Sequence, residues 1–150
     1  ASAGAGEAAT ADLRRALAAV SLGVAQAAFE SALRYAQQRV AFGKPIAEHQ
    51  AVQLALADMA TDITAARLLL ADCAADRAPA AALMARVFAA DVAAAATLDA
   101  LRIHGGYGYI TEFPVERYYR DAAQLLVTPT EVDRERRALG RLVAAAAPAR

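Results

Sequence analysis

The sequence predicts an all-α protein that folds as an antiparallel four-helix bundle. Apolar residues recur every three or four positions through several long stretches, which is the spacing of helices with a buried face. Alanine is abundant, whereas the chain has four Phe, five Tyr and no Trp, and this composition favours closely packed helices over a sheet. Gly and Pro residues fall between the periodic stretches and end them.

The first two helices are expected after a short linker. Residues 1–10 are small and Gly-rich without periodicity, so we expect a linker or arm there and the bundle over residues 11–150. From Asp12 onward, two apolar stripes predict a helix that ends at the turn Phe42-Gly43-Lys44-Pro45. The second helix, over about residues 47–76, has the most regular pattern: Val52, Leu56, Met59, Ile63, Ala66, Leu70 and Cys73.

The remaining helices follow the same signals. The third is predicted from the spacing of Leu83, Val87, Ala90, Ala94, Leu98 and Leu101. Pro114 opens a shorter helix over residues 115–122. Thr128, Pro129 and Glu131 have the pattern of a helix start, with Thr128 as the N-cap and Glu131 completing a capping box. The four long helices are therefore expected to form the bundle.

Composition and charge exclude several classes of function. Lys plus Arg and Asp plus Glu number 16 each, so the chain lacks the basic character of nucleic-acid-binding or acidic-membrane-binding proteins. Charged residues are expected to interrupt each apolar run before the roughly 20 residues that a membrane span needs. The single cysteine, Cys73, can form neither an internal disulfide nor a metal site. These features predict a soluble cytoplasmic protein without a metal or a nucleic-acid partner.

Three motifs lie in or beside the predicted turns. They are R-V-A-F-G-K-P-I at 39–46 followed by His49 and Gln50, I-H-G-G-Y-G-Y at 103–109, and E-F-P-V-E-R-Y-Y-R-D-A at 112–122. By itself the first motif is equally consistent with an ordinary turn between helices. The second is equally consistent with a helix-capping turn beside a structural histidine, His104.

Together, the order and spacing of the three motifs resemble the C-terminal helical domain of the acyl-CoA dehydrogenase family, over about residues 12–145. In that family the first motif reaches across a dimer interface to the diphosphate and adenosine end of FAD. The glycine turn lets the main chain approach adenine or phosphate closely. The resemblance implies a cofactor-binding set of Arg39, Phe42, His49, Gln50, Gly105 and Gly106.

Neither position that the resemblance assigns to the family's catalytic base holds a carboxylate in this chain. The reaction removes a proton from the carbon α to the thioester carbonyl while a hydride leaves the β carbon for the flavin, so a base is required. The usual glutamate position falls on Pro129, and the alternative position in some relatives, just before Arg14, falls on Leu13. No catalytic residue is therefore assigned. Glu131 is the nearest carboxylate, and the predicted capping box gives it a structural role. Arg102 stands where the family has a Gln, which puts the adenine contact in question.

The resemblance implies an FAD-dependent oxidoreductase that dehydrogenates the α,β bond of an acyl-CoA thioester in fatty acid metabolism. The chain would be one part of a homo- or hetero-oligomer, a dimer or tetramer, and inactive when isolated. Acyl-CoA would bind to domains that this chain lacks or to a partner subunit. The proline at the base position favours one alternative, a catalytically inactive subunit or module of a heteromeric acyl-CoA dehydrogenase. A more distant alternative is a family member with a different flavin reaction that needs no such base.

Overall fold

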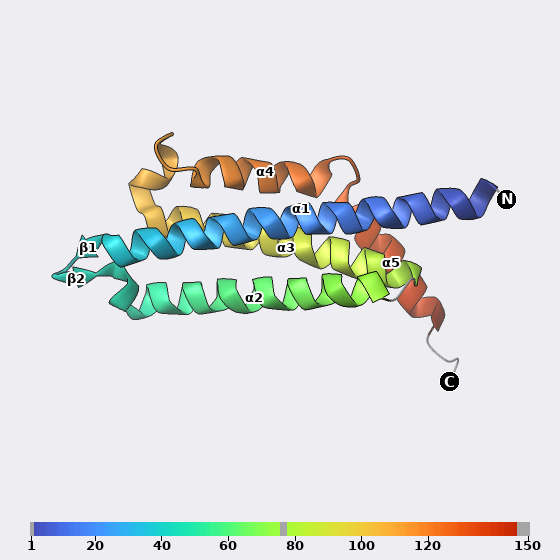
Figure 1. The fold of residues 1–150 in the computed structure, drawn as a ribbon, viewed down its shortest axis with the longest axis horizontal. Coiled ribbons are helices and arrows are strands. Elements are labelled where there is room, and N and C mark those ends of the chain that lie inside the picture. The colour runs from blue at the N-terminus through green and yellow to red at the C-terminus, as the bar shows by residue number, and fades with distance from the viewer. Residues whose placement is uncertain (1, 76–77, 147–150) are drawn as a thin grey trace.

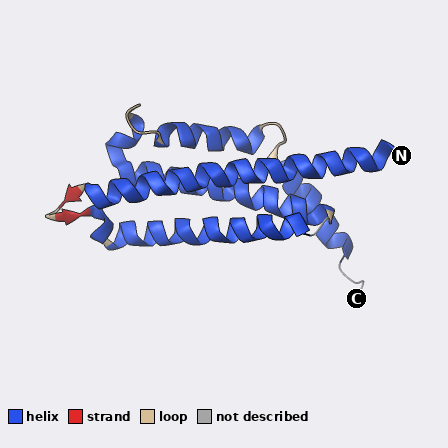
Figure 2. Cartoon of the chain, viewed as in Figure 1, coloured by secondary structure: helices blue, strands red, loops and turns tan. Residues whose placement is uncertain are grey.

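The structure is a computed structural model that describes residues 2–75 and 78–146. The described residues form five α-helices: α1 (Ser2–Gln38), α2 (Gln50–Ala75), α3 (Pro79–His104), α4 (Val115–Val127) and α5 (Val132–Ala146). Strands β1 (Val40–Ala41) and β2 (Lys44–Pro45) and the 3₁₀ helix η1 (Ile46–Glu48) connect α1 to α2, and the 3₁₀ helix η2 (Gly105–Tyr109) follows α3 (Figure 1 and Figure 2).

The helices form an up-and-down bundle. α1 and α3 run in the same direction at its centre, and α2 and α4 run in the opposite direction on either side of them (Figure 1). α5 packs against α3 at the end opposite the hairpin. The predicted all-α antiparallel bundle is confirmed, with one difference. The fourth helix of the bundle is the short α4, and the last helix lies outside it.

Alanine side chains fill the contact between α1 and α3. On α1 the fully buried alanines are Ala18, Ala25, Ala28, Ala32 and Ala36, which recur at helical spacing on one face. On α3 the buried alanines include Ala82, Ala85, Ala89, Ala93, Ala96 and Ala100. Small side chains allow two helix backbones to approach closely, and alanine also has the highest helix propensity. The alanine-rich composition thus supports both the helices and their packing.

The described part of the predicted linker or arm, residues 2–10, is helical, and residue 1 lies outside the described residues. α1 begins at Ser2 and continues without a break through Asp12 to Gln38. The hydroxyl of Thr10 donates to the carbonyl oxygen of Gly6 at 2.8 Å, one turn earlier in this helix. Alanine and glutamate around the glycines supply the helix propensity that the prediction underestimated.

The predicted capping box at Thr128 to Glu131 is also wrong. α4 continues past Ala122 to Val127, and Thr128 is its C-cap. The last turn is retained because Leu126 packs on a buried cluster of Val87, Ala90 and Val132. α5 begins at Val132, and the carbonyl of Glu131 accepts its first hydrogen bond from Glu135. Pro129 therefore lies in the loop between α4 and α5.

Two long helices are strongly apolar although charged residues such as Glu30 and Asp91 interrupt them, as the sequence predicted. The segments Gly6–Gln38 and Pro79–Tyr109 are long and apolar enough to cross a membrane, judged by length and composition alone. An apolar stretch of 18 residues in the second segment is 67% buried inside the protein, and the corresponding stretch of the first segment is 39% buried. The hydrophobicity of α3 therefore has a structural explanation, because α3 is the central helix of the core.

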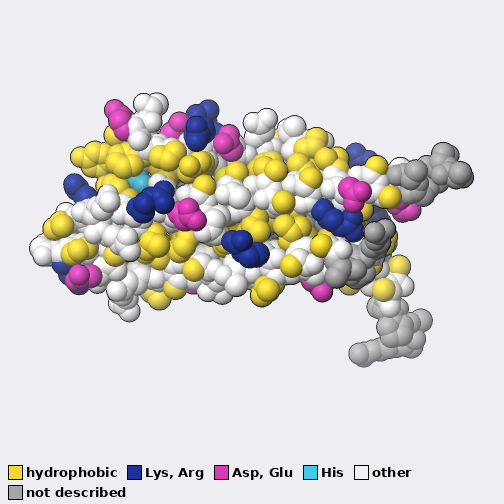
Figure 3. All heavy atoms as spheres, in the orientation of Figure 1, with side chains coloured by type: hydrophobic (Ala, Val, Ile, Leu, Met, Phe, Trp, Pro, Cys, Tyr) yellow, Lys and Arg dark blue, Asp and Glu magenta, His cyan; other side chains and the backbone are white. Residues whose placement is uncertain are grey.

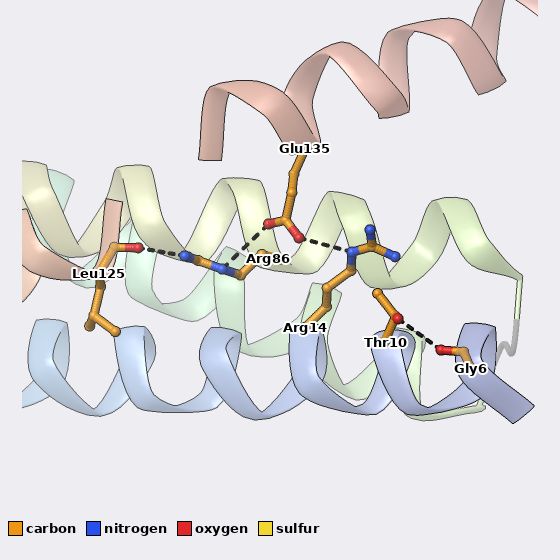
Figure 4. Close-up of polar contacts among 6 residues, drawn as sticks. All are labelled: Gly6, Thr10, Arg14, Arg86, Leu125 and Glu135. Carbon is orange, nitrogen blue, oxygen red and sulfur yellow. Dashed lines mark hydrogen bonds and ion pairs between the residues drawn. The ribbon is translucent and has the colours of Figure 1, made fainter. Parts of the chain in front are cut away.

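A buried ion network joins four helices beside the α4–α5 loop (Figure 4). Arg86 of α3 is fully buried, donates to the carbonyl oxygen of Leu125 in α4, and places its Nε 3.6 Å from Oε2 of Glu135 in α5. Glu135 is 4% exposed and accepts a 2.9 Å hydrogen bond from Nε of Arg14 in α1. Burial lowers the pKa of Arg86, and the negative charge of Glu135 opposes that shift. The network fixes the helices that flank the loop at 128–131.

The turn after α3 uses its glycines for different reasons. Gly105 caps α3 with φ 59° and ψ −133°, a conformation that other residues rarely adopt, and its N–H bonds to the carbonyls of Arg102 and Leu101. At Gly108, an added Cβ would lie 3.0 Å from the carbonyl oxygen of Leu101. Gly106 has no positive φ, and a Cβ there would meet nothing within 4 Å. Backbone geometry thus requires Gly105, packing requires Gly108, and neither requires Gly106.

Replacing Glu135 with Gln should lower the free energy of unfolding by about 3 kcal/mol, because the buried Arg86 cation loses the carboxylate that balances it. The control is Glu131→Gln, an exposed position at the start of α5, which should change stability by less than about 0.5 kcal/mol. Urea unfolding followed by circular dichroism measures both values. Equal stabilities of the two variants would contradict a stabilising role for the buried pair.

Replacing Gly105 with Ala should destabilise the chain by about 1 kcal/mol, because a Cβ is strained at this positive φ. Gly106→Ala should leave the stability unchanged or slightly raise it, since alanine restricts the unfolded chain. Thermal unfolding of both variants measures the difference. A cost at Gly106 equal to that at Gly105 would show that this description of the turn is wrong.

Candidate functional site

The hairpin end of the bundle holds the residues that the sequence motifs indicated. α1 and α3 are parallel, so the C-terminal ends of both helices lie at this end, and the hairpin and η2 extend from them (Figure 1). Hydrogen bonds from Ile46 N–H to the Arg39 carbonyl and from His49 N–H to the Ile46 carbonyl fold the connection back onto α2. Motifs more than fifty residues apart in sequence therefore share one surface.

The hairpin presents an exposed aromatic ring at its tip. Val40 pairs with Pro45 and Ala41 with Lys44, which leaves Phe42 and Gly43 as a two-residue turn. Both turn residues have positive φ, 53° for Phe42 and 82° for Gly43, as in a type I′ turn. Phe42 is 97% exposed. A large apolar side chain held in this way is suited to contact another surface.

A first cleft, of about 540 Å³, lies between the end of α1 and the glycine turn. Its lining includes Tyr35 from α1, Arg39 directly after α1, His104 from α3, and Gly105, Gly106 and Tyr107 from η2. The guanidinium carbon of Arg39 lies 5.6 Å from the centre of the Tyr107 ring. None of the described residues that line this cleft is Asp or Glu. The cleft therefore combines a cation, aromatic rings and exposed main chain, which suits a flat ligand that carries phosphate.

A second cleft, of about 400 Å³, adjoins the first and shares Ile46 and Ile103 with it. Phe42, His49 and Arg102 line this second cleft. His49 is held by a 3.1 Å hydrogen bond between Nε2 and the Ala41 carbonyl, and its ring meets the Phe42 ring edge-on at 6.0 Å. Arg102 forms a 2.9 Å ion pair with Asp99.

The structure brings the six predicted cofactor residues to one end but not into one pocket. Arg39, Gly105 and Gly106 share the first cleft, and Phe42 and His49 line the second. Gln50 is exposed at the first position of α2 and lines neither. Their role in cofactor binding stays a prediction.

Sequence reasoning missed Tyr35 and Tyr107 and treated His104 as purely structural. Tyr35 lies four residues before Arg39, whose N–H bonds to the Tyr35 carbonyl oxygen at 2.9 Å, and this spacing is the signal that could have identified it. His104 is buried among the rings of Tyr35 and Phe113, with centroid distances of 4.3 and 5.4 Å. Burial lowers the pKa of His104, and a hydrogen bond to the Ala100 carbonyl opposes the shift. The imidazole is therefore neutral at pH 7.

The two positions to which the sequence analysis assigned the family's base, 129 and 13, lie at the other end of the bundle. Pro129 is exposed and lies between an apolar cleft of about 280 Å³, shared with Leu17 and Val20, and a polar cleft of about 450 Å³, shared with Arg14. Leu13 directly precedes Arg14 and is 42% exposed. The alternative base positions thus converge on one region, and neither carries a carboxylate.

Three carboxylates lie near this region. Glu135 is buried and engaged by Arg14 and Arg86. Asp121 lines the apolar cleft, and Glu131 lines the polar one. Because α5 begins after Glu131, the capping role that the sequence suggested for its side chain does not apply. Glu131 is therefore an exposed carboxylate beside Pro129 in a cleft.

The surface shows paired rather than segregated charges. On the face drawn in Figure 3, Lys and Arg side chains lie close to Asp and Glu side chains. Among the described residues of the whole surface, Arg120 pairs with Glu116 and Arg136 with Asp91, both at 2.8 Å. That face offers no extended basic patch for a nucleic-acid backbone. Among the residues that the structure describes, no cluster of three His, Cys, Asp or Glu could hold a metal ion.

Comparison with known proteins identifies the family. Residues 7–128 match the family described as acyl-CoA dehydrogenase, C-terminal domain. An acyl-CoA dehydrogenase of Bacillus subtilis is 47% identical over 111 residues, which cover 71% of this chain and 29% of that protein. A cyclohexane-1-carbonyl-CoA dehydrogenase of Geobacter metallireducens is 44% identical over 114 residues, which cover 73% of this chain and 30% of that protein. Butyryl-CoA dehydrogenase from Megasphaera elsdenii has a similar structure, with a TM-score of 0.86 and 36% identity. The match covers 92% of this chain and 38% of that protein.

The resemblance predicted from the three motifs is confirmed. This chain spans about a third of the length of the relatives it matches. The family is FAD-dependent in general, and the cation, rings and open glycine of the first cleft fit the adenosine and phosphate end of that cofactor. The chain belongs to the acyl-CoA dehydrogenase family and corresponds to its C-terminal domain.

Proposed function

We propose that this chain is the C-terminal bundle of an FAD-dependent oxidoreductase that dehydrogenates the α,β bond of an acyl-CoA thioester. The bundle completes the adenosine end of an FAD site across a subunit interface. One observation carries the proposal: Arg39 of the first motif and Gly105 and Gly106 of the second line one cleft, and no Asp or Glu is among the described residues that line it. FAD would supply the hydride acceptor, and this chain's residues bind and orient it.

Each predicted cofactor residue has a distinct role in this proposal. Arg39 offers a planar fork of N–H donors to phosphate oxygens. Gly106 leaves space at the main chain for a flat or anionic group, since a Cβ there meets nothing within 4 Å. Phe42 projects from the hairpin towards a neighbouring subunit, and His49 holds the hairpin in place through the Ala41 carbonyl. Gln50 extends the same surface at the start of α2.

The sequence motifs assign no residue as the proton-abstracting base. In this proposal Glu131 replaces the residue missing at Pro129 and Leu13, because it is exposed in the cleft that Pro129 borders. The proline at position 129 instead favours the alternative in which this chain carries no base. A chain without the base would serve as a catalytically inactive subunit of a heteromeric acyl-CoA dehydrogenase, or act in a family member with a different flavin reaction.

The wider setting is also part of the proposal. The protein would act in the cytoplasm as a dimer or tetramer, with acyl-CoA held largely by domains outside this chain. Extensive burial of α3, the more apolar of the two long hydrophobic segments, supports a soluble enzyme, because that apolar surface is used inside the bundle.

Arg39→Met should weaken FAD binding about tenfold, because it removes a charged donor from the first cleft while preserving the unbranched stem. Arg34→Met is the control, since Arg34 lies in the last two turns of α1, close in sequence to Arg39, and pairs with Glu30 at 4.0 Å outside the cleft. FAD retention during gel filtration of the chain assembled with the family's other domains, followed by absorbance, measures the effect. Equal losses in both variants would contradict the assignment of the cleft.

Acyl-CoA should bleach the bound flavin of that assembly under anaerobic conditions, and Glu131→Gln should slow bleaching at least about 100-fold. Glu112→Gln, an exposed carboxylate in the turn before α4, is the control and should bleach like the parent. If the parent fails to bleach while Pro129→Glu does, the chain is a subunit without a base, and the dehydrogenase assignment fails for this chain.

A further inference from the structure

Three exposed aspartates form an acidic face on one side of α2. Asp58, Asp62 and Asp72 are exposed, whereas Met59 and Ile63 turn inward and are each 3% exposed. The helical rotation of about 100° per residue places the three aspartates within an arc of about 80° around the helix axis. None of them forms an ion pair with a residue that the structure describes. They are exceptions to the charge pairing seen elsewhere on the surface.

Three exposed arginines form a basic face on the outer side of α5. Val132 and Glu135 are buried and fix the opposite side of this helix against the bundle. Arg134, Arg137 and Arg141 fall within an arc of about 60°. Arg134 and Arg141 also border the polar cleft near the α4–α5 loop. Within the described part of the chain, none of the three arginines has an ion-pair partner.

The acidic and basic faces have matching spacing. Asp58 and Asp62 are four residues apart, and so are Arg137 and Arg141. Each pair therefore spans about 6 Å along its helix. Two helices that pack side by side in opposite directions form both ion pairs in a single register.

An apolar contact extends this match. Leu54 precedes Asp58 by four residues, and Ala145 follows Arg141 by four residues. In the same antiparallel register Leu54 therefore lies against Ala145. Leu54 is 58% exposed, so the contact removes apolar surface from water and adds to ion pairs that are individually weak at a protein surface.

We propose that α5 of one copy of this chain docks antiparallel on α2 of a second copy, with Arg137 paired to Asp62 and Arg141 paired to Asp58. A second copy has the complementary charge, because one chain carries both faces and its Lys plus Arg equal its Asp plus Glu at 16 each. In a dimer with two-fold symmetry each contact forms twice. The contact is separate from the hairpin, where the proposed function places a neighbouring subunit, and so goes beyond that function.

Sedimentation velocity of the chain at about 0.05 M NaCl measures self-association, which about 0.5 M NaCl should weaken because salt screens exposed charges. Asp58→Arg with Asp62→Arg should raise the dissociation constant at least about tenfold, because arginines then face arginines. The control is Glu7→Arg with Glu112→Arg, which makes the same change in charge at two exposed sites off the acidic face and should associate like the parent. Circular dichroism checks that each variant folds.

A mixture of charge-swapped variants tests the pairing itself. Arg137→Asp with Arg141→Asp should also lose self-association, because aspartates then face the acidic face of α2. When this variant is mixed with the aspartate-reversed variant, the arginines introduced on α2 meet the aspartates introduced on α5. The native α5 arginines of one variant likewise meet the native α2 aspartates of the other. Both contacts are attractive, so the mixture should form a heterodimer.

Three results would overturn the inference. They are a parent that stays monomeric at about 1 mM, an aspartate-reversed variant that associates like the parent, and a mixture that does not restore association. The test contains no flavin, so these results do not bear on the proposed cofactor cleft. If association survives both charge reversals and is lost in Phe42→Ser, the exposed hairpin mediates it. The α2–α5 contact is then wrong, and the proposed function stands.

Discussion

Close packing of α1 against α3 through alanine side chains determines where the candidate site residues of this chain lie. Because the two helices are parallel, their C-terminal ends meet at one end of the bundle, and the hairpin and η2 extend from that end side by side. Arg39 and Gly106 can then line one cleft although the first and second motifs are far apart in sequence. Larger residues at Ala28 or Ala32 would separate the helices and widen that cleft.

The opposite end of the bundle is organised by charge instead of by small apolar side chains. Arg86 and Glu135 are buried together, and through Arg14 and the Leu125 carbonyl they hold α1, α4 and α5 around one loop. That loop carries Pro129, the position of the family's base. If the base position is the one that the sequence analysis assigned, the surrounding helices are held in place while a proline occupies that position. This combination accounts for both the dehydrogenase proposal and its inactive-subunit alternative.

Local sequence signals predicted the features that depend on local chemistry. Apolar periodicity predicted the helices, and the Gly and Pro residues near Gly43 and Gly105 predicted the turns that carry the site. Features that depend on tertiary packing could not be predicted. α4 extends past Ala122 because Leu126 reaches a cluster formed partly by α3, and this displaced the predicted helix start at Thr128. His104 was read as structural because no sequence pattern reveals that one nitrogen lacks a partner.

The most direct test of the account is a pair of calorimetric titrations of the chain, one with ADP and one with FMN, which represent the two halves of FAD. The cleft between Arg39 and the glycine turn is assigned to the adenosine half alone, so the account predicts measurable binding of ADP and none of FMN under the same conditions. If FMN binds at least as tightly as ADP, the cleft does not recognise the adenosine half and the account is contradicted.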